Sequence, residues 1–394
     1  MNRYQVLTLN HISSHGLRRL PAPRYAVGKT AERPDAILVR SHSMHEMAIP
    51  PSVRAIGRAG AGTNNIPVPE MSRRGVPVFN APGANANAVK ELVLAALLMA
   101  ARNVVPALGY VGALGDSADL EKQVEDGKKR FAGVELVHRS LGIVGLGAIG
   151  GLVADTALKL GMKVVGFDPD ITVDAAWRLP SSVRKAATIE ELLQQSDFVT
   201  LHVPLLPATR HMIDEKRLAV MKHGATLLNF ARDALVDEHA AVAALRAHRL
   251  KCYVTDFPAA ALLHEPGVVA LPHLGASTAE AEENCAVMVI DQVREYLENG
   301  TVLNAVNFPN VDMARESPYR VAIANANVPN MLGQISTAMA NGGLNIHNMV
   351  NKSRGEMAYT LVDVDSPVHD ELIRAIAAID GVLSVRAIPA EDAG

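Results

Sequence analysis

Apolar residues in the middle of the chain come in short, nearly continuous runs that are separated by stretches with helical spacing. The runs are LGIVG (141–145), KVVGF (163–167), DFVTLHV (197–203), TLLNF (226–230), CYVT (252–255) and VVAL (268–271). Runs of this length without polar alternation predict strands that are buried on both faces. The stretches between them, such as IEELLQQ (189–195), have the period of a helix. We therefore predict an α/β protein with a doubly wound parallel sheet and right-handed crossovers.

The segments on either side of this block predict a second α/β unit. Strands are expected at 36–40, 53–59 and 76–81, and helices at 89–102 and 278–299 bracket the block. Because the chain returns after the block, this unit is predicted to be discontinuous. The predicted division has a smaller domain of residues 1–88 and 276–310, and a larger domain of residues 89–275 that contains the doubly wound Rossmann sheet.

The last part of the chain, residues 316–394, has a pattern of its own. It follows a polar, proline-containing segment and predicts strand, helix, strand, strand, helix and strand in that order. This order is typical of a split βαβ unit, in which helices pack on an antiparallel sheet. We predict a third, βαββαβ domain at residues 316–394.

A glycine-rich turn follows the first strand of the central block. GLGAIG supplies Gly145, Gly147 and Gly150, and Asp168 ends the next strand eighteen residues after Gly150. The small residues allow a close approach of the backbone to a pyrophosphate at a helix N-terminus. A strand-end carboxylate at this spacing accepts hydrogen bonds from ribose hydroxyls and repels a 2′-phosphate. The turn therefore predicts a site for NAD rather than NADP.

Polar side chains follow five successive predicted strands. In chain order they are Asp168, the segment His202-Val203-Pro204, Arg232, Asp256 and His273. Taken singly, each is also a common strand-end residue with no role in chemistry. Open α/β sheets bind ligands beyond the carboxyl ends of their strands. The position of all five polar groups at this edge therefore favours an active site there.

Composition and charge reduce the number of possible binding partners. The 394 residues are 49% hydrophobic and 20% charged, and the net charge is −3. This balance gives no basic surface for nucleic acid or for an anionic membrane. The two cysteines form no disulfide framework, and no apolar run reaches the length of a bilayer span. We expect a soluble cytoplasmic protein with no nucleic-acid or membrane partner.

Motifs along most of the chain resemble the D-2-hydroxyacid dehydrogenase family, and within it the branch that acts on 3-phosphoglycerate. In the central block these are GLGAIG with FDP, HVPLLPATRHMI, NFARDALVDE and PHLGAST. In the first domain they are ILVRSH, GRAGAGTNNI and NAPGANANAVKEL. The C-terminal unit resembles an ACT domain, a small ligand-binding module. The family's nucleotide domains dimerise, so the resemblance implies a homodimer or homotetramer.

The resemblance implies a role for each strand-end residue. His273 would be the base that takes the hydroxyl proton of the substrate, and Arg232 would grip the substrate carboxylate with its fork of donors. Asp256 would bind the nicotinamide carboxamide. No residue is implied as a metal ligand. The residues implied around NAD are Gly145, Gly147, Ala148, Ile149, Gly150, Asp168, Val203, Pro204, Thr209, Phe230, Ala231, Arg232, Asp256, His273, Gly275 and Ala276.

Further cations and asparagines match positions that bind small molecules in the family. Arg40 with Ser41, Arg58, and either Lys129 or Arg130 would hold a phosphorylated substrate, although each is also compatible with a solvated surface charge. These cations favour 3-phosphoglycerate over glyoxylate or hydroxypyruvate. In the C-terminal unit, Asn325, Asn327 and Asn345 fall where L-serine binds as an effector, although asparagines in turns are often structural.

One expected group is absent from the sequence. The family pairs its histidine with a glutamate in the loop after the preceding strand, where this chain has Ala260. Glu265 and His264 precede the strand VVAL, so they are predicted to lie at the opposite edge from His273. Three alternatives remain open: a dehydrogenase whose histidine is oriented by water or by another acid, a reductase for another hydroxyacid, and a sensor of NAD or an amino acid without catalysis.

Overall fold

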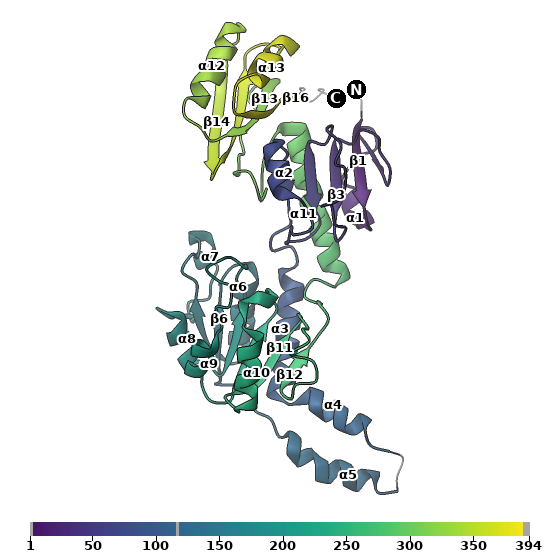
Figure 1. The fold of residues 1–394 in the computed structure, drawn as a ribbon, viewed down its shortest axis with the longest axis vertical. Coiled ribbons are helices and arrows are strands. Elements are labelled where there is room, and N and C mark those ends of the chain that lie inside the picture. Colours follow the sequence, from purple (N-terminus) through teal and green to yellow (C-terminus); the bar gives the residue numbers. More distant parts are fainter. Residues whose placement is uncertain (1–2, 116–117, 389–394) are drawn as a thin grey trace. The chain divides into compact units, whose positions relative to one another are not determined.

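The computed structural model describes residues 3–115 and 118–388 (Figure 1). The chain divides into two compact units, and the divisions fall between Asn85 and Ala86 and between Thr278 and Ala279. The continuous middle segment is called the nucleotide unit here, and the two flanking segments together are called the flanking unit.

The nucleotide unit is built on a parallel sheet whose described strands have the order β12-β11-β10-β9-β6-β7-β8. Each of the six apolar runs forms one of these strands, so the α/β class and the doubly wound sheet are confirmed. The strands are β6 (Ser140–Val144), β7 (Lys163–Phe167), β8 (Arg184–Lys185), β9 (Phe198–Leu201), β10 (Ala225–Asn229), β11 (Leu250–Thr255) and β12 (Val268–Ala270).

Neighbouring residues of one strand belong to two different hydrophobic clusters. Leu227 packs with α8, α9 and α10 on one face of the sheet, whereas Leu228 packs with α3 and α6 on the other. Burial on both faces explains why these strands lack polar alternation. The helical elements are α3 (Ala86–Ala101), α4 (Val104–Gly112), α5 (Leu120–Gly127), η1 (Lys128–Phe131), α6 (Ala148–Lys159), α7 (Val173–Trp177), α8 (Ile189–Gln195), α9 (Glu215–Val220), η2 (Asp233–Leu235) and α10 (Glu238–Arg246).

The flanking unit contains a second parallel sheet of order β2-β1-β3-β4-β5 in its described part. The long helix α11 (Ala279–Asn299) contributes Val289, Ile290 and Val293 to the core of this sheet. The remaining elements are β1 (Tyr4–Leu9), α1 (Ser14–Leu17), β2 (Tyr25–Gly28), β3 (Ala36–Val39), β4 (Ala55–Arg58), α2 (Val68–Arg73) and β5 (Val78–Phe79).

The C-terminal part of the flanking unit has the predicted order βαββαβ. Its antiparallel sheet has the strand order β14-β15-β13-β16. Its elements are β13 (Tyr319–Ala326), α12 (Met331–Asn341), β14 (Ile346–Arg354), β15 (Met357–Val364), α13 (Asp370–Ala377) and β16 (Val382–Ile388). The predicted domain extends to residue 394, and its last residues lie outside the described part. The division into three domains remains a prediction.

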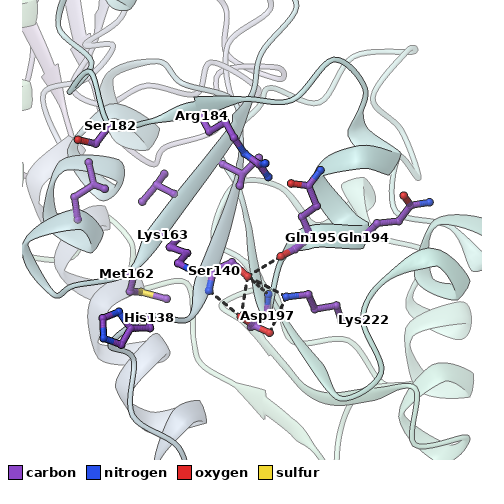
Figure 2. Close-up of a pocket in the computed structure, with 13 residues that line it drawn as sticks. His138, Ser140, Met162, Lys163, Ser182, Arg184, Gln194, Gln195, Asp197 and Lys222 are labelled. Carbon is purple, nitrogen blue, oxygen red and sulfur yellow. Dashed lines mark hydrogen bonds and ion pairs between the residues drawn. The ribbon is translucent and has the colours of Figure 1, made fainter.

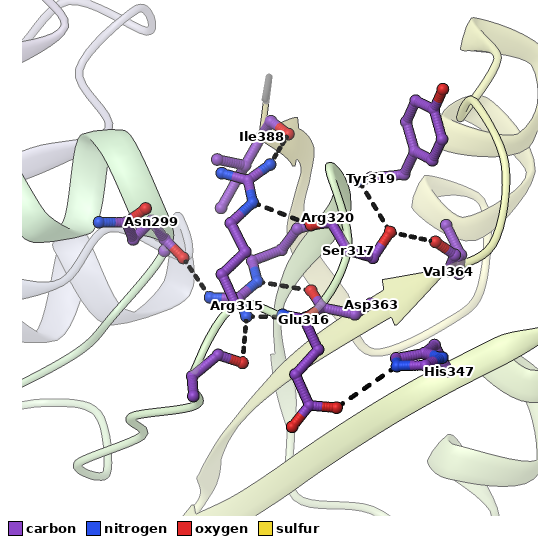
Figure 3. A network of polar contacts seen from close by, with 12 residues as sticks. Asn299, Arg315, Glu316, Ser317, Tyr319, Arg320, His347, Asp363, Val364 and Ile388 are labelled. Atoms are coloured by element: carbon purple, nitrogen blue, oxygen red, sulfur yellow. Dashed lines mark hydrogen bonds and ion pairs between the residues drawn. The ribbon is translucent and has the colours of Figure 1, made fainter. Parts of the chain in front are cut away.

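A buried ion pair lies within the C-terminal sheet, and its arginine also bonds to the end of α11 (Figure 3). Arg320 donates to both carboxylate oxygens of Asp363, at 2.6 and 2.9 Å, and both side chains are at most 1% exposed. The same guanidinium donates to the carbonyl oxygens of Asn299 and Ala314, at 3.1 and 3.0 Å. The sheet is therefore fixed to the rest of the unit by hydrogen bonds from a buried guanidinium.

Candidate functional site

The register of the nucleotide sheet aligns the last residues of six strands in one row. Phe167 pairs with Val144, Val144 with Leu201, and Leu201 with Asn229. The row continues through Thr255 to Ala270. The next residues along the chain therefore leave the sheet at one edge, and these include Asp168, His202 and Asp256.

The glycine turn has the geometry that a close backbone approach requires. Gly145 has φ +90°, and a Cβ there would lie 2.5 Å from the carbonyl oxygen of His202. A Cβ on Gly150 would collide with the Gly145 carbonyl, so the start of α6 packs directly on the turn. At Gly147, the N-cap of α6, an added Cβ would meet no atom within 4 Å. Space for a pyrophosphate is thus left at a helix N-terminus.

Asp168 is held beside this turn by backbone donors. Its Oδ2 accepts from the amide of Leu146 at 2.8 Å, and its Oδ1 accepts from the amide of Asp170 at 3.1 Å. The half-buried carboxylate is thus fixed next to the turn, where a ribose would lie. A 2′-phosphate at this position would meet a negative charge.

The loop after β9 is closed by one hydroxyl. Thr209 donates to the carbonyl of Pro204 at 2.7 Å and accepts from the amide of Leu206 at 2.8 Å, so this hydroxyl is engaged within the loop. At the start of the loop, burial lowers the pKa of His202 to about 4. Its Nε2 lies 3.0 Å from the hydroxyl of Thr200, and its Nδ1 is buried without a hydrogen-bond partner among the described residues. His202 is therefore a neutral imidazole at neutral pH.

The segment after β10 presents Arg232. Buried Asn229 donates to the Arg232 carbonyl at 2.8 Å and accepts from the amide of Ala231 at 3.2 Å, which fixes the turn. The exposed Arg232 guanidinium donates to the carbonyl of Ala231 at 2.6 Å, and its other donors point to no protein acceptor in the described chain. Phe230 is buried in the core, so its side chain is not available to a cofactor.

Asp256 and His273 follow adjacent strands. The Asp256 side chain is 1% exposed, and its Oδ2 accepts from the Gly275 amide at 3.0 Å. Its Oδ1 is buried and has no hydrogen-bond partner in the part of the chain that the structure describes. Burial raises the pKa of Asp256, and the Gly275 amide and the nearby His273 partly oppose that rise. His273 is exposed, and its ring meets the Phe257 ring edge-on at a centroid distance of 4.9 Å. Within residues 3–115 and 118–388 no carboxylate accepts a hydrogen bond from the His273 ring.

The prediction that Glu265 lies at the opposite edge is confirmed. Its carboxylate forms a bidentate ion pair with Arg246, at 3.0 and 2.7 Å, before β12 begins. Ala260 is exposed and carries no group that could pair with a histidine.

Two cations predicted to bind substrate lie together in the flanking unit. Arg58 donates from Nε to the carbonyl of Arg40 at 3.1 Å, and Arg40 forms an ion pair with Glu282 at 2.6 Å. A Cβ on Gly60, which has φ +153°, would occupy the place of the Arg58 guanidinium. Gly60 is therefore required for the position of Arg58. The neighbouring Ser41 is exposed.

Lys129 and Arg130 lie in η1 of the nucleotide unit. The Arg130 guanidinium stacks over the ring of Tyr110, 4.5 Å from its centroid, and lies 5.8 Å from the Phe131 centroid. Arg130 thus links η1 to α4 by a cation–π contact, whereas Lys129 is exposed.

The three asparagines predicted to bind an effector do not share one cavity. Asn325 and Asn327 line a cavity of about 210 Å³ with Asn330 and Asn351, and the Asn325 Oδ1 is buried with no hydrogen-bond partner in the described chain. Asn345 instead bonds to the Asp365 carboxylate, at 3.2 Å from its amide and 3.1 Å from its side chain. The sequence prediction missed Asn330 and Asn351, because nothing in the sequence shows that the start of α12 and the middle of β14 line one cavity with the end of β13.

A cavity of about 820 Å³ lies at the opposite edge of the nucleotide sheet (Figure 2). Asp197 accepts from Ser140 and from Lys222, at 2.7 and 3.0 Å. Burial alone would raise the pKa of Asp197, but these hydrogen bonds hold it below the usual value. The cluster ties the starts of β6 and β9 together and contains none of the predicted site residues.

Among the described residues, no single helix combines the length and apolar composition of a bilayer span. Helices α3 and α4 reach these values only as a pair that is bent by 67°.

Known proteins are similar to this chain over most of its length. Residues 94–275 match the family model of the D-isomer specific 2-hydroxyacid dehydrogenase, NAD binding domain. D-3-phosphoglycerate dehydrogenase of Haemophilus influenzae is 32% identical over 89% of this chain and 85% of its own length. The enzyme of the same name from Methanocaldococcus jannaschii is 35% identical over 79% of this chain, which spans only 57% of that relative.

Solved structures give the same picture. A glyoxylate reductase from Paecilomyes thermophila has a TM-score of 0.63 at 26% identity and covers 78% of this chain and 99% of its own. The NAD⁺-bound 3-phosphoglycerate dehydrogenase of Entamoeba histolytica has a TM-score of 0.60 at 24% identity, over 77% of this chain and 99% of its own. The second similarity concerns the fold alone.

Proposed function

The chain belongs to the D-isomer specific 2-hydroxyacid dehydrogenases, in the group of the D-3-phosphoglycerate dehydrogenases, and from this we propose that it oxidises 3-phospho-D-glycerate to 3-phosphohydroxypyruvate. The observation that carries the proposal is the row of strand ends, which brings His273 and Arg232 to the same edge as the glycine turn. The reaction would be the first step of the phosphorylated route to L-serine.

The residues at this edge fit NAD. Gly147 and the start of α6 would hold the pyrophosphate, and Asp168 would accept from the ribose. The buried Asp256 Oδ1, which has no partner in the described protein, would accept from the carboxamide. When bound, NAD supplies the acceptor for the substrate's hydride.

The chain's own side chains supply proton transfer and orientation. His273 would accept the hydroxyl proton through a ring nitrogen, because its ring is exposed and no carboxylate of the described chain occupies either ring nitrogen. Arg232 would bind the substrate carboxylate with the guanidinium donors that the protein leaves open. His202 is half-buried and neutral, so it would not compete for the proton.

Arg58 and Arg40 are the proposed phosphate ligands. The support is their contact in the flanking unit and the requirement for Gly60 beside Arg58. Ser41 and Lys129 remain predicted substrate contacts. For Arg130 the cation–π contact with Tyr110 offers a structural role instead.

A comparison of substrates tests this function. Arg58→Lys and Arg58→Ala should raise KM strongly for 3-phosphoglycerate and little for unphosphorylated D-glycerate, with lysine the milder change. Arg54→Ala, which removes an exposed cation of the same sheet, is the control. Equal effects on both acids would remove the phosphate assignment. Faster reduction of glyoxylate or hydroxypyruvate than turnover of the phosphorylated pair would favour the reductase alternative.

We also propose that the C-terminal unit is an ACT-like module that binds L-serine and lowers activity. The cavity of Asn325 and Asn327 supports this, because the buried Asn325 Oδ1 would accept from an ammonium or hydroxyl group. Asn327→Ala in the full chain should abolish the heat of serine binding, whereas Asn345→Ala should preserve it. Loss of the heat of serine binding in Asn345→Ala but not in Asn327→Ala would contradict the placement of serine in the cavity of Asn325 and Asn327.

Apolar side chains on α4 and α5 support a homodimer. Leu108 and Val111 are 67% and 55% exposed, and Leu120 on α5 is 41% exposed. We propose that a second copy of the chain covers them, and that the protein works in the cytoplasm, where its two buried free thiols remain reduced. Sedimentation of the parent and of Leu108→Glu would test the dimer, which the charge should dissociate.

A further inference from the structure

Two contacts connect the loops that follow β11 and β12. In the first, the Gly275 amide donates to the Asp256 Oδ2 at 3.0 Å. In the second, the ring of Phe257 meets the ring of His273 edge-on, with the centroids 4.9 Å apart and the planes at 63°. Gly275 lies two residues after His273, and Phe257 directly follows Asp256. His273 is therefore held from its backbone side and from its ring side.

A base on an exposed loop needs this kind of support. An imidazole that is free to rotate spends little time in the orientation that accepts a proton, so a third group commonly orients it. No carboxylate bonds to the His273 ring in the described chain. Glu265 is paired with Arg246, and position 260 is an alanine.

Asp256 anchors the loop that carries this histidine. Its carboxylate is 1% exposed and accepts from the Gly275 amide, two residues after His273. The other ionisable groups at this edge are Asp168, which is bonded to Leu146 and Asp170, the exposed Arg232, and the neutral His202.

We propose that Asp256 and Phe257 are positioning residues for His273, with Asp256 anchoring its loop through the Gly275 amide and Phe257 setting the plane of the ring. The proposal rests on the proposed function in that His273 is taken as the base. This role is additional to cofactor binding, because the two carboxylate oxygens of Asp256 have different partners. Oδ2 accepts from the loop of His273, and Oδ1 remains available to a donor of the cofactor.

The first test does not use catalysis. The ring of His273 is followed by NMR at fixed pH in the cofactor-free full chain, and its signal is assigned with His273→Gln. Asp256→Ala removes the acceptor of the Gly275 amide, and Phe257→Leu removes the ring that faces His273, so the His273 ring signal should shift in each variant. An unchanged His273 ring signal in either folded variant would overturn the positioning role of the residue that was substituted. This outcome is independent of the identity of the substrate.

The second test concerns the ring. Phe257→Leu should reduce kcat about tenfold and leave the KM for NAD and for 3-phosphoglycerate nearly unchanged, because only orientation is lost. Phe257→Tyr retains the ring edge and should restore most of kcat. Equal kcat in the leucine variant and the parent, or no recovery with tyrosine, would contradict a positioning role. If the parent turns over no hydroxyacid, the proposed function fails while the NMR result still stands.

Discussion

Removal of the charge of Asp363 should destabilise the flanking unit more than any exposed ion pair could. In Asp363→Asn the Arg320 guanidinium stays buried and loses the two charged contacts at 2.6 and 2.9 Å. Breaking a buried pair on one side costs about 3–5 kcal/mol. Arg320 keeps its hydrogen bonds to the carbonyls of Asn299 and Ala314, so we expect the lower end, about 3 kcal/mol.

The effect is measurable by thermal unfolding. For a unit of this size about 3 kcal/mol corresponds to a fall in Tm of roughly 6–12 °C. Asp155→Asn removes an exposed pair with Lys159 and is the control, with an expected cost of about 0.5 kcal/mol or less. Arg320→Met with Asp363→Leu should recover much of the loss, because no unpaired charge remains buried.

The pH dependence gives an independent check. Burial alone would raise the pKa of Asp363, but Arg320 and the amide of Glu316 hold it below the usual value. A carboxyl with a lowered folded pKa stabilises the protein above its unfolded pKa, near 3.9, and loses that contribution as the pH falls through the folded value. The difference in Tm between the parent and Asp363→Asn should therefore persist from pH 5 to 8 and shrink below about pH 4. A Tm within 2 °C of the parent at pH 7 would refute the reasoning.

Three further outcomes are expected. Asp168→Ala should raise kcat/KM with NADP relative to NAD by removing the charge that repels a 2′-phosphate, and comparable parent values for both cofactors would contradict this role. Ala260→Glu should move the acidic limb of the kcat/KM profile to higher pH, and an unmoved limb would show that the loop does not bring residue 260 to His273. Because the pKa of His202 is about 4 when folded and near 6.5 when unfolded, the parent should lose stability as the pH falls through this interval, and His202→Gln should lose less.

The nucleotide sheet could be predicted because strands that are buried on both faces are short, nearly continuous apolar runs in the sequence. The row of strand ends followed from it, since parallel strands bring consecutive carboxyl ends to one edge. The sequence prediction missed β1 and β2, and it missed α4 and α5, where Pro106 and several glycines interrupt the helical pattern. Helix α3 begins at Ala86, three residues before the predicted start at Val89.

Pair contacts between distant segments could not be predicted. Arg320 lies within an apolar strand, and only the register with β15 shows that Asp363 is opposite. Likewise, the ring contact of Phe257 with His273 depends on how two loops fold back beyond the sheet. Asn345 matched a family position, yet its hydrogen bonds to Asp365 separate it from Asn325 and Asn327. Local spacing does not determine such contacts.

The most direct test of the central claim is NADH formation by the purified full chain with 3-phospho-D-glycerate, followed by its absorbance, with coupled removal of the product. The account predicts turnover that depends on this substrate, prefers NAD to NADP, and falls by at least about a hundredfold in His273→Gln, in line with loss of a general base. Arg232→Lys should lower kcat/KM strongly as well, because an ammonium cannot replace the guanidinium fork. NAD binding without turnover of this acid, or full activity in His273→Gln, would contradict the account.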